Sequence, residues 1–92
     1  MTTKTSPAAL QISSHVFCRH FDRLSAEVQA AVTGKIDEMG RDLGGFGHLR
    51  LTGRTEFKLR VGDYRVLYEF DVTAGRIFLL YIGHRREIYK RA

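Results

Sequence analysis

The chain has 92 residues, of which 43% are hydrophobic and 27% are charged, and its formal net charge is +5 at pH 7; this favours one folded domain and excludes a disordered chain. A single cysteine, Cys18, excludes an internal disulfide, and no cysteine and histidine spacing fits a structural zinc site. No apolar run approaches the roughly 20 residues of a membrane span, and the start lacks the apolar stretch of a secretory signal. We expect one domain over residues 1–92 in a reducing cytoplasm, with residues 1–7 as a disordered lead.

The first half of the chain predicts one short strand followed by two helices. Residues 8–13 alternate as in a strand. Ser14 is a candidate cap for a helix over residues 15–23, and Ser25 for a second helix that runs to about Asp42. This second helix has apolar residues three or four apart, which form one face that we expect to pack on a sheet: Leu24, Val28, Val32, Ile36, Met39 and Leu43.

A glycine-rich segment and a hairpin come next. The glycines between residues 44 and 53 predict a mobile loop, of which Arg50 is a basic member. Residues 56–61 and 64–70 both alternate between apolar and polar, and only Gly62 and Asp63 separate them. This spacing predicts a β-hairpin with a two-residue connection.

The two-residue connection fixes the register of the hairpin. If Val61 opposes Tyr64, then Arg60 opposes Arg65, and one face carries Phe57, Leu59, Val61, Tyr64, Val66, Tyr68 and Phe70. We expect the helices to cover that face. The opposite face then carries Lys58, Arg60 and Arg65 around Leu67.

The last predicted strand, residues 76–83, is apolar on both sides and is expected inside the sheet, after a turn over residues 71–75. The elements follow the order β-α-α-β-β-β. This order predicts an α+β domain with two layers, in which a helical hairpin packs on a mainly antiparallel sheet.

Positive charge is concentrated in the C-terminal half. Residues 1–47 contain five basic and five acidic side chains, whereas residues 48–92 contain ten basic and five acidic ones. Such a basic surface is typical of proteins that bind nucleic acid or acidic proteins. The alternative is that the charge serves only solubility.

Two arginines directly opposite each other in a hairpin repel, and an anion between them reverses the sign of that interaction. Arg60 and Arg65 have this arrangement. His84, Arg85 and Arg86 follow the last strand, and Tyr89 lies close behind them. If this strand neighbours the hairpin, these side chains form a site for a phosphodiester, with Tyr89 stacked on a base. The alternative is that the arginines extend into water or pair with Glu69 and Glu87.

Two motifs carry a family resemblance. They are Val61-Gly62-Asp63-Tyr64-Arg65-Val66-Leu67-Tyr68 and Ile82-Gly83-His84-Arg85-Arg86-Glu87-Ile88-Tyr89. Both resemble the signature of the RelE branch of the RelE/ParE superfamily of toxins, and residues 49–53 resemble the family's leucine, any residue, glycine entry to the sheet. The resemblance covers about residues 49–90, and its fold agrees with the one predicted above.

The resemblance implies a toxin of a type II toxin-antitoxin system that cuts mRNA in the ribosomal A site and is neutralised by a small antitoxin. The expected reaction is attack of a ribose 2′-hydroxyl on the adjacent phosphate, which gives 2′,3′-cyclic phosphate and 5′-hydroxyl ends without a metal or other cofactor. Catalysis needs a base, an acid and cations against the charge on the phosphorane.

The family motif assigns roles to residues of this chain. Lys58 corresponds to the base or charge-stabilising lysine, Arg65 to the phosphate ligand, and Arg85 to a second phosphate contact or proton donor. Tyr89 corresponds to the residue that orients or stacks the nucleotide, and Arg60 assists from a neighbouring position.

Other residues are candidates on weaker grounds. His84 has the one side chain of this group with an ordinary pKa near neutrality, so it is an independent candidate for the acid or base, or a cap at the strand end. Arg86 and Arg50 are candidate RNA contacts, Arg50 together with His48 at the glycine-rich loop. His15, Cys18 and His20 lie on or near the first predicted helix, where a plain amphipathic helix is the stronger interpretation than a metal site.

One position departs from the family. Some members carry a second lysine two residues before Lys58, where this chain has Glu56. Two alternatives stay open: a ParE-like toxin that inhibits DNA gyrase by binding it, and a degenerate toxin that binds only its antitoxin. The ParE branch generally lacks the complete arginine and tyrosine set, so Arg65, Arg85 and Tyr89 favour RNA cleavage.

Overall fold

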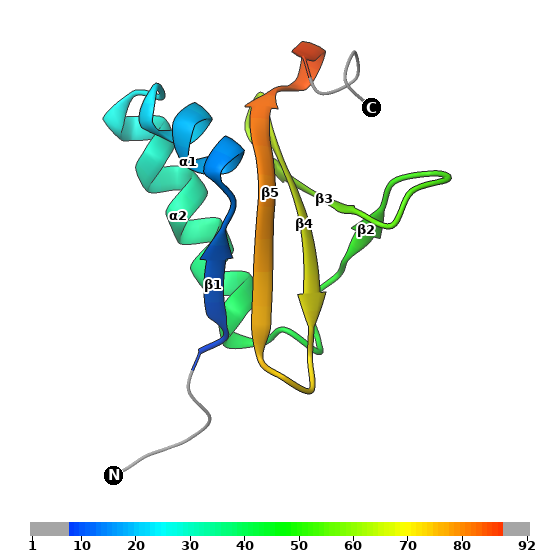
Figure 1. The fold of residues 1–92 in the computed structure, drawn as a ribbon. Coiled ribbons are helices and arrows are strands. Elements are labelled where there is room, and N and C mark those ends of the chain that lie inside the picture. The colour runs from blue at the N-terminus through cyan, green and yellow to red at the C-terminus, as the bar shows by residue number, and fades with distance from the viewer. Residues whose placement is uncertain (1–7, 88–92) are drawn as a thin grey trace, which may run out of the picture.

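A computed structural model describes residues 8–87, so the expected disordered lead, residues 1–7, and Tyr89 lie outside the described residues. The elements are β1 (Leu10–Ser13), α1 (His15–Asp22), α2 (Ala26–Arg41), β2 (Leu49–Arg50), β3 (Phe57–Val61), β4 (Tyr64–Asp71) and β5 (Arg76–His84). Both helices cover one face of the sheet (Figure 1). The predicted α+β class and β-α-α-β-β-β order are confirmed, with β2 as an additional two-residue strand.

The described strands form one sheet in the order β1-β5-β4-β3-β2. β1 is parallel to β5, and the other neighbours are antiparallel. The predicted hairpin register is confirmed, since Arg60 pairs with Arg65 and Val61 with Tyr64. Gly62, in the turn between them, has φ +58°, a conformation that residues with a Cβ adopt only at a cost. β5 lies inside the sheet, between β1 and β4, as its apolar sequence predicts.

The two predicted helix caps are present. The Ser14 hydroxyl accepts a hydrogen bond from the Phe17 N–H at 3.0 Å, and it donates one to the Leu80 carbonyl at 2.8 Å. The Ser25 hydroxyl accepts from the Val28 N–H at 3.3 Å. The first cap therefore also fastens the start of α1 to β5.

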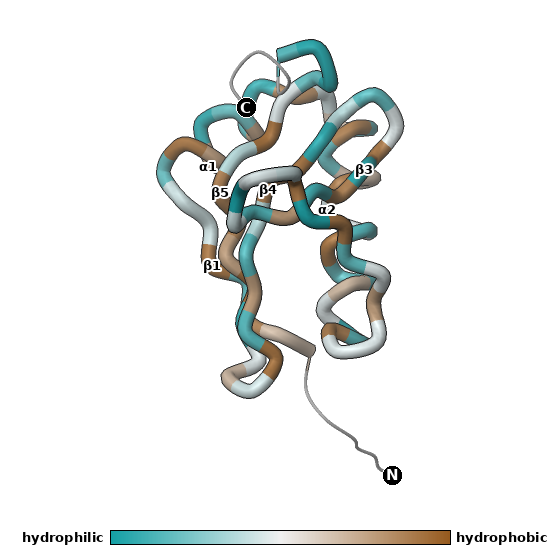
Figure 2. Tube along the Cα trace, turned by 90° about the vertical axis from the view of Figure 1, so that its right-hand side faces the viewer, coloured by the Kyte–Doolittle hydropathy of each residue, from teal (hydrophilic) through white to brown (hydrophobic). Residues whose placement is uncertain are grey.

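The core lies between the two helices and the face of the sheet that they cover. Hydrophobic and hydrophilic residues alternate along much of the chain (Figure 2). The apolar residues predicted for the second helix and for the hairpin belong to this core or pack against it, with the exception of Tyr64. Tyr64 is half-buried and lies outside the core cluster. The fully buried members of the core are Phe17, Val32, Ile36, Met39, Leu43, Leu59, Val61, Val66, Tyr68, Ile77, Leu79 and Ile82.

The segment predicted as a mobile loop, residues 44–53, consists mostly of turns and irregular backbone but also contains the short strand β2, which was not predicted. The His48 ring anchors this segment, because its Nδ1 lies 2.6 Å from the Tyr68 hydroxyl and its Nε2 lies 2.8 Å from the Leu43 carbonyl. The carbonyl only accepts, so Nε2–H donates to it and Nδ1 accepts from the hydroxyl. The ring also stacks on Phe70 with centroids 3.8 Å apart. β2 follows His48 directly and pairs with β3.

Candidate functional site

The face of the sheet opposite the helices, here called the open face, carries the predicted basic residues. Alternation along β3 and β4 places Lys58, Arg60 and Arg65 on the face opposite the buried core residues of the same strands. Arg65 pairs with Arg60 on one side and with Gly83 of β5 on the other. The sheet therefore brings three predicted site residues together at one end of the hairpin.

Arg65 is buried, with an exposed fraction of 4%, so it does not extend into water. Its Nη1 donates to the Gly62 carbonyl at 3.0 Å and to the Tyr64 carbonyl at 2.9 Å. Its Nε is buried and has no hydrogen-bond partner among the described residues. The guanidinium is thus a fixed cation at the hairpin turn, with one buried donor unsatisfied among the described residues.

The other two members of this group are more accessible. Arg60 is exposed, and Lys58 is half-buried. An anion at this end of the hairpin would meet one fixed guanidinium and the exposed side chain of Arg60. Together with Arg85, described next, we call Lys58, Arg60 and Arg65 the basic site.

The residues after β5 turn back over the same end of the sheet. The Arg85 N–H donates to the Asp63 carbonyl at 2.8 Å, so the hairpin turn anchors the start of the helical turn formed by residues 85–87. Arg85 and Arg86 are exposed. The structure therefore joins the backbone at Arg85 to the turn that also binds Arg65, while the predicted stacking residue Tyr89 lies outside the described residues.

His84 caps this helical turn. Its Nδ1 accepts from the Arg86 N–H at 3.3 Å, and its own N–H donates to the Glu87 carboxylate at 3.4 Å. This reciprocal pair has the geometry of a capping box. Because His84 pairs with Tyr64 in the register, its side chain belongs to the helix side of the sheet and not to the open face.

Arg50 also lies away from the basic site. It pairs with Phe57, whereas the open-face residue Lys58 pairs with Leu49. Its guanidinium carbon lies 4.9 Å from the centroid of the Phe57 ring, a cation–π contact on the helix side of the sheet. His48, in the aromatic core, is equally separate from the basic site.

Glu56 has a partner that the sequence analysis missed. Arg54 binds its carboxylate through two hydrogen bonds, of 3.0 Å and 2.9 Å. These hydrogen bonds lower the pKa of Glu56 to about 2. Nearby, the Thr55 hydroxyl donates to Glu69 at 2.9 Å. The acidic residue at the family's lysine position is therefore neutralised locally; the Arg-Thr-Glu alternation was the signal for this pair.

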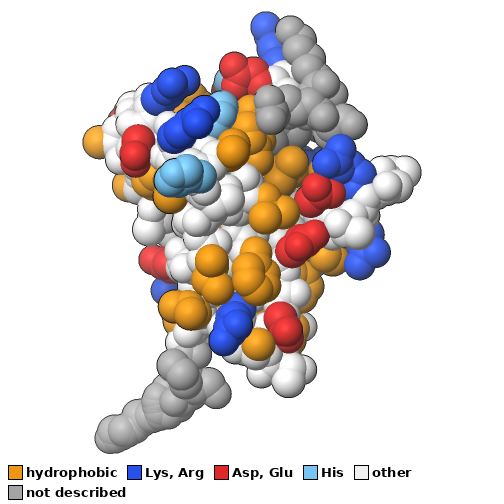
Figure 3. Space-filling model, in the orientation of Figure 1, with side chains coloured by type: hydrophobic (Ala, Val, Ile, Leu, Met, Phe, Trp, Pro, Cys, Tyr) orange, Lys and Arg blue, Asp and Glu red, His pale blue; other side chains and the backbone are white. Residues whose placement is uncertain are grey.

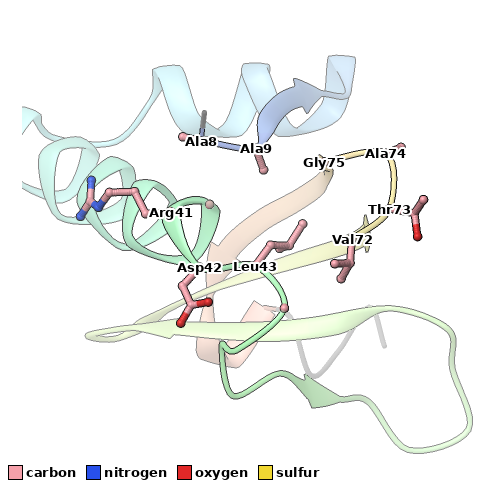
Figure 4. A pocket seen from close by; sticks show the side chains of 11 residues that line it. Ala8, Ala9, Arg41, Asp42, Leu43, Val72, Thr73, Ala74 and Gly75 are labelled. Carbon is pink, nitrogen blue, oxygen red and sulfur yellow. The ribbon is translucent and has the colours of Figure 1, made fainter. Parts of the chain in front are cut away.

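A second feature lies at the opposite end of the sheet. A pocket of about 430 Å³ is lined by the C-terminal end of α2 and the turn between β4 and β5. Leu43 and Val72 point toward each other there, whereas Arg41 extends away (Figure 4). Its lining consists mostly of small residues, and Arg41, Asp42 and Thr73 are its polar side chains. Among residues 8–87, no helix is long and apolar enough to cross a membrane, and no group of three or more His, Cys, Asp or Glu side chains is placed to bind a metal ion.

Solved structures of RelE toxins share this fold. A toxin-antitoxin complex RelBE2 from Mycobacterium tuberculosis matches at 24% identity with a TM-score of 0.69, over 90% of this chain and 98% of that chain. The isolated RelE toxin of E. coli matches at 15% identity with a TM-score of 0.71, over 91% and 98%. The RelE-RelB complex of Pyrococcus horikoshii matches at 19% identity with a TM-score of 0.68, over 86% and 97%. The fold is that of the RelE-like toxins.

A family model places the chain more narrowly. The model of the ParE toxin of type II toxin-antitoxin systems, parDE, matches residues 19–89. This chain therefore belongs to the ParE toxin family, within the RelE/ParE superfamily, and it is a toxin of a type II toxin-antitoxin system. No curated protein matches.

Proposed function

We propose that this toxin is an endoribonuclease that cuts mRNA on the ribosome and thereby inhibits translation. The observation that carries the proposal is the buried Arg65 guanidinium, fixed by two carbonyls and with an unsatisfied Nε. A phosphate on the open face would be attracted by this fixed cation, and the exposed Arg60 across the hairpin would add a second cation that can contact it directly. A preorganised cation is what the phosphorane of RNA cleavage requires.

The proposed step is an internal transfer within the RNA. A ribose 2′-oxygen forms a bond to the adjacent phosphorus and gives its proton to a base, for which Lys58 is the candidate. The bond from phosphorus to the 5′-oxygen breaks, and that oxygen takes a proton from an acid, for which Arg85 is the candidate. The products are a 2′,3′-cyclic phosphate and a 5′-hydroxyl end.

The proposed protein partner is an antitoxin. Several of the structurally similar toxins were solved as complexes with RelB antitoxins. The excess of positive charge from residue 48 onward suits an antitoxin segment with acidic side chains. An antitoxin segment on the open face would cover the basic site and keep RNA away from it.

Translation with purified protein and mapping of transcript 5′ ends tests the proposal. Cuts with 5′-hydroxyl ends that require ribosomes, and that disappear in Arg85→Ala, are expected. Intact mRNA at doses that inhibit growth would exclude cleavage.

The second candidate function is inhibition of DNA gyrase by binding it. One observation favours it: the matching family model is that of the ParE toxin. Double-strand DNA breaks in expressing cells, without cuts in mRNA, would select this function. Absence of any growth inhibition would instead indicate a degenerate toxin that binds only its antitoxin.

A further inference from the structure

A second pocket lies between the end of α1 and the end of β5, next to the helical turn that carries Arg85. Its volume is about 310 Å³, at the lower end of the range of about 300–1,000 Å³ for small-molecule sites. Six side chains give it chemical character: His20, Arg23, Tyr64, Tyr81, His84 and Glu87. In Figure 3, basic and histidine side chains gather over α1, next to hydrophobic side chains along β5. We call this cavity the aromatic pocket.

Two pairs of rings form its walls. The His20 and Tyr81 rings have centroids 4.8 Å apart, and the Tyr64 and His84 rings have centroids 5.7 Å apart. Gly83 shapes the pocket by having no side chain, because a Cβ there would lie 3.0–3.3 Å from atoms of the Tyr81 ring and hydroxyl. The missing Cβ lets the Tyr81 ring lie close over the β5 backbone.

The polar groups of the pocket include both hydrogen-bond donors and a hydrogen-bond acceptor. Since Nδ1 of His84 accepts a hydrogen bond from the Arg86 N–H, the neutral ring carries its proton on Nε2 and has a donor left for a ligand. Arg23 provides an exposed cation, and Glu87 a carboxylate that accepts hydrogen bonds from amino groups. Flat walls with a donor, an acceptor and a cation are what an unstacked nucleobase and its phosphate require.

We propose that the aromatic pocket binds one nucleobase of single-stranded RNA; this rests on the proposed RNA cleavage. The pocket adjoins one member of the basic site, because its lining residues His84 and Glu87 flank Arg85 along the helical turn. A strand whose phosphate contacts the exposed Arg85 therefore has a neighbouring base within reach of the pocket. The base that enters it selects which sequences are cut.

NMR spectroscopy of the full chain with nucleoside 5′-monophosphates and short single-stranded RNA tests the proposal. Saturable shifts of the His20 and His84 ring resonances are expected. His20→Ala removes one wall and should weaken nucleotide binding by about fivefold or more. His15→Ala, an exposed histidine of α1 outside the pocket, is the matched control and should bind as wild type.

A second pair of variants tests the pocket without altering His20, which is half-buried and whose replacement could also affect folding. Arg23→Ala should weaken binding of nucleotides that carry a phosphate, whereas Arg19→Ala, exposed in the last turn of α1 and outside the pocket, should not. Unchanged affinity in both His20→Ala and Arg23→Ala overturns the proposal. So does a pocket whose resonances shift with purified antitoxin but not with nucleotides.

Mapping of cut sites separates this proposal from the proposed function. If wild type cuts mRNA, His20→Ala should alter the base preference around the cut while cleavage persists, and an unaltered preference overturns the base-selecting role alone. If wild type cuts no mRNA while its ring resonances still respond to nucleotides, the proposed function fails and nucleotide binding by the pocket is supported.

Discussion

Arg60 and Arg65 lie directly opposite each other across the β3–β4 hairpin, yet the Arg60 side chain is exposed and Arg65 is 4% exposed. The difference arises because Arg65 turns back onto the Gly62 and Tyr64 carbonyls. Arg65 therefore contributes to the stability of the fold as well as to the basic site, whereas Arg60 contributes only to the basic site.

Arg65→Ala should lower both stability and activity. It leaves two carbonyls without their guanidinium donor, and a free-energy loss of about 1–3 kcal/mol is expected in urea denaturation. Arg60→Ala is the matched control, and because its side chain is exposed it should change stability by no more than about 0.5 kcal/mol. Equal stability of the two variants would contradict a structural role for Arg65.

Arg85→Ala should abolish inhibition of translation without loss of stability. The side chain is exposed, and the bond that anchors this residue comes from its backbone N–H, which alanine retains. Arg86→Ala, the exposed neighbour, should retain more activity. In vitro translation together with thermal denaturation checks both statements, and wild-type inhibition by Arg85→Ala would remove this residue from the proposed site.

His48 and Tyr68 should be energetically coupled. Tyr68→Phe leaves Nδ1 of His48 without its donor, and His48→Ala also removes the ring that stacks on Phe70. We expect losses of about 1–2 kcal/mol for Tyr68→Phe and about 2–4 kcal/mol for His48→Ala. A double-mutant cycle by urea denaturation should give a coupling of about 1 kcal/mol; strictly additive losses would show that the bond contributes nothing.

Glu56 should contribute to acid stability. Its pKa is lowered from 4.5 to about 2, so its stabilising effect is complete above pH 4.5 and is lost as pH falls toward 2. Stability curves of wild type and Glu56→Gln should converge over that window. Glu38→Gln, which removes only a 3.9 Å pair with Lys35 on an exposed helix surface, is the control and should not shift the acid limb. Parallel curves for wild type and Glu56→Gln would contradict the Arg54 contact, and a carboxyl NMR titration measures the pKa directly.

Local physical chemistry made much of the fold predictable. Ser14 and Ser25 cap helices through their own hydroxyls, and the two-residue link after Val61 sets the hairpin register. Side chains alternate strictly in a strand, so that register also fixed which residues share the open face. The motifs around Arg65 and Arg85 each lie within one continuous stretch of chain. They could therefore indicate the superfamily without knowledge of the tertiary structure.

The sequence by itself determined the helix caps, the hairpin and the face on which Lys58, Arg60 and Arg65 lie. Only the tertiary structure decided that Arg65 is buried, that His48 belongs to the aromatic core, and that His20 and Arg23 share a pocket with His84. The first set depends on periodicity and neighbours along the chain. The second depends on which distant segments pack together, and that is set by burial of the whole core, which no local pattern encodes.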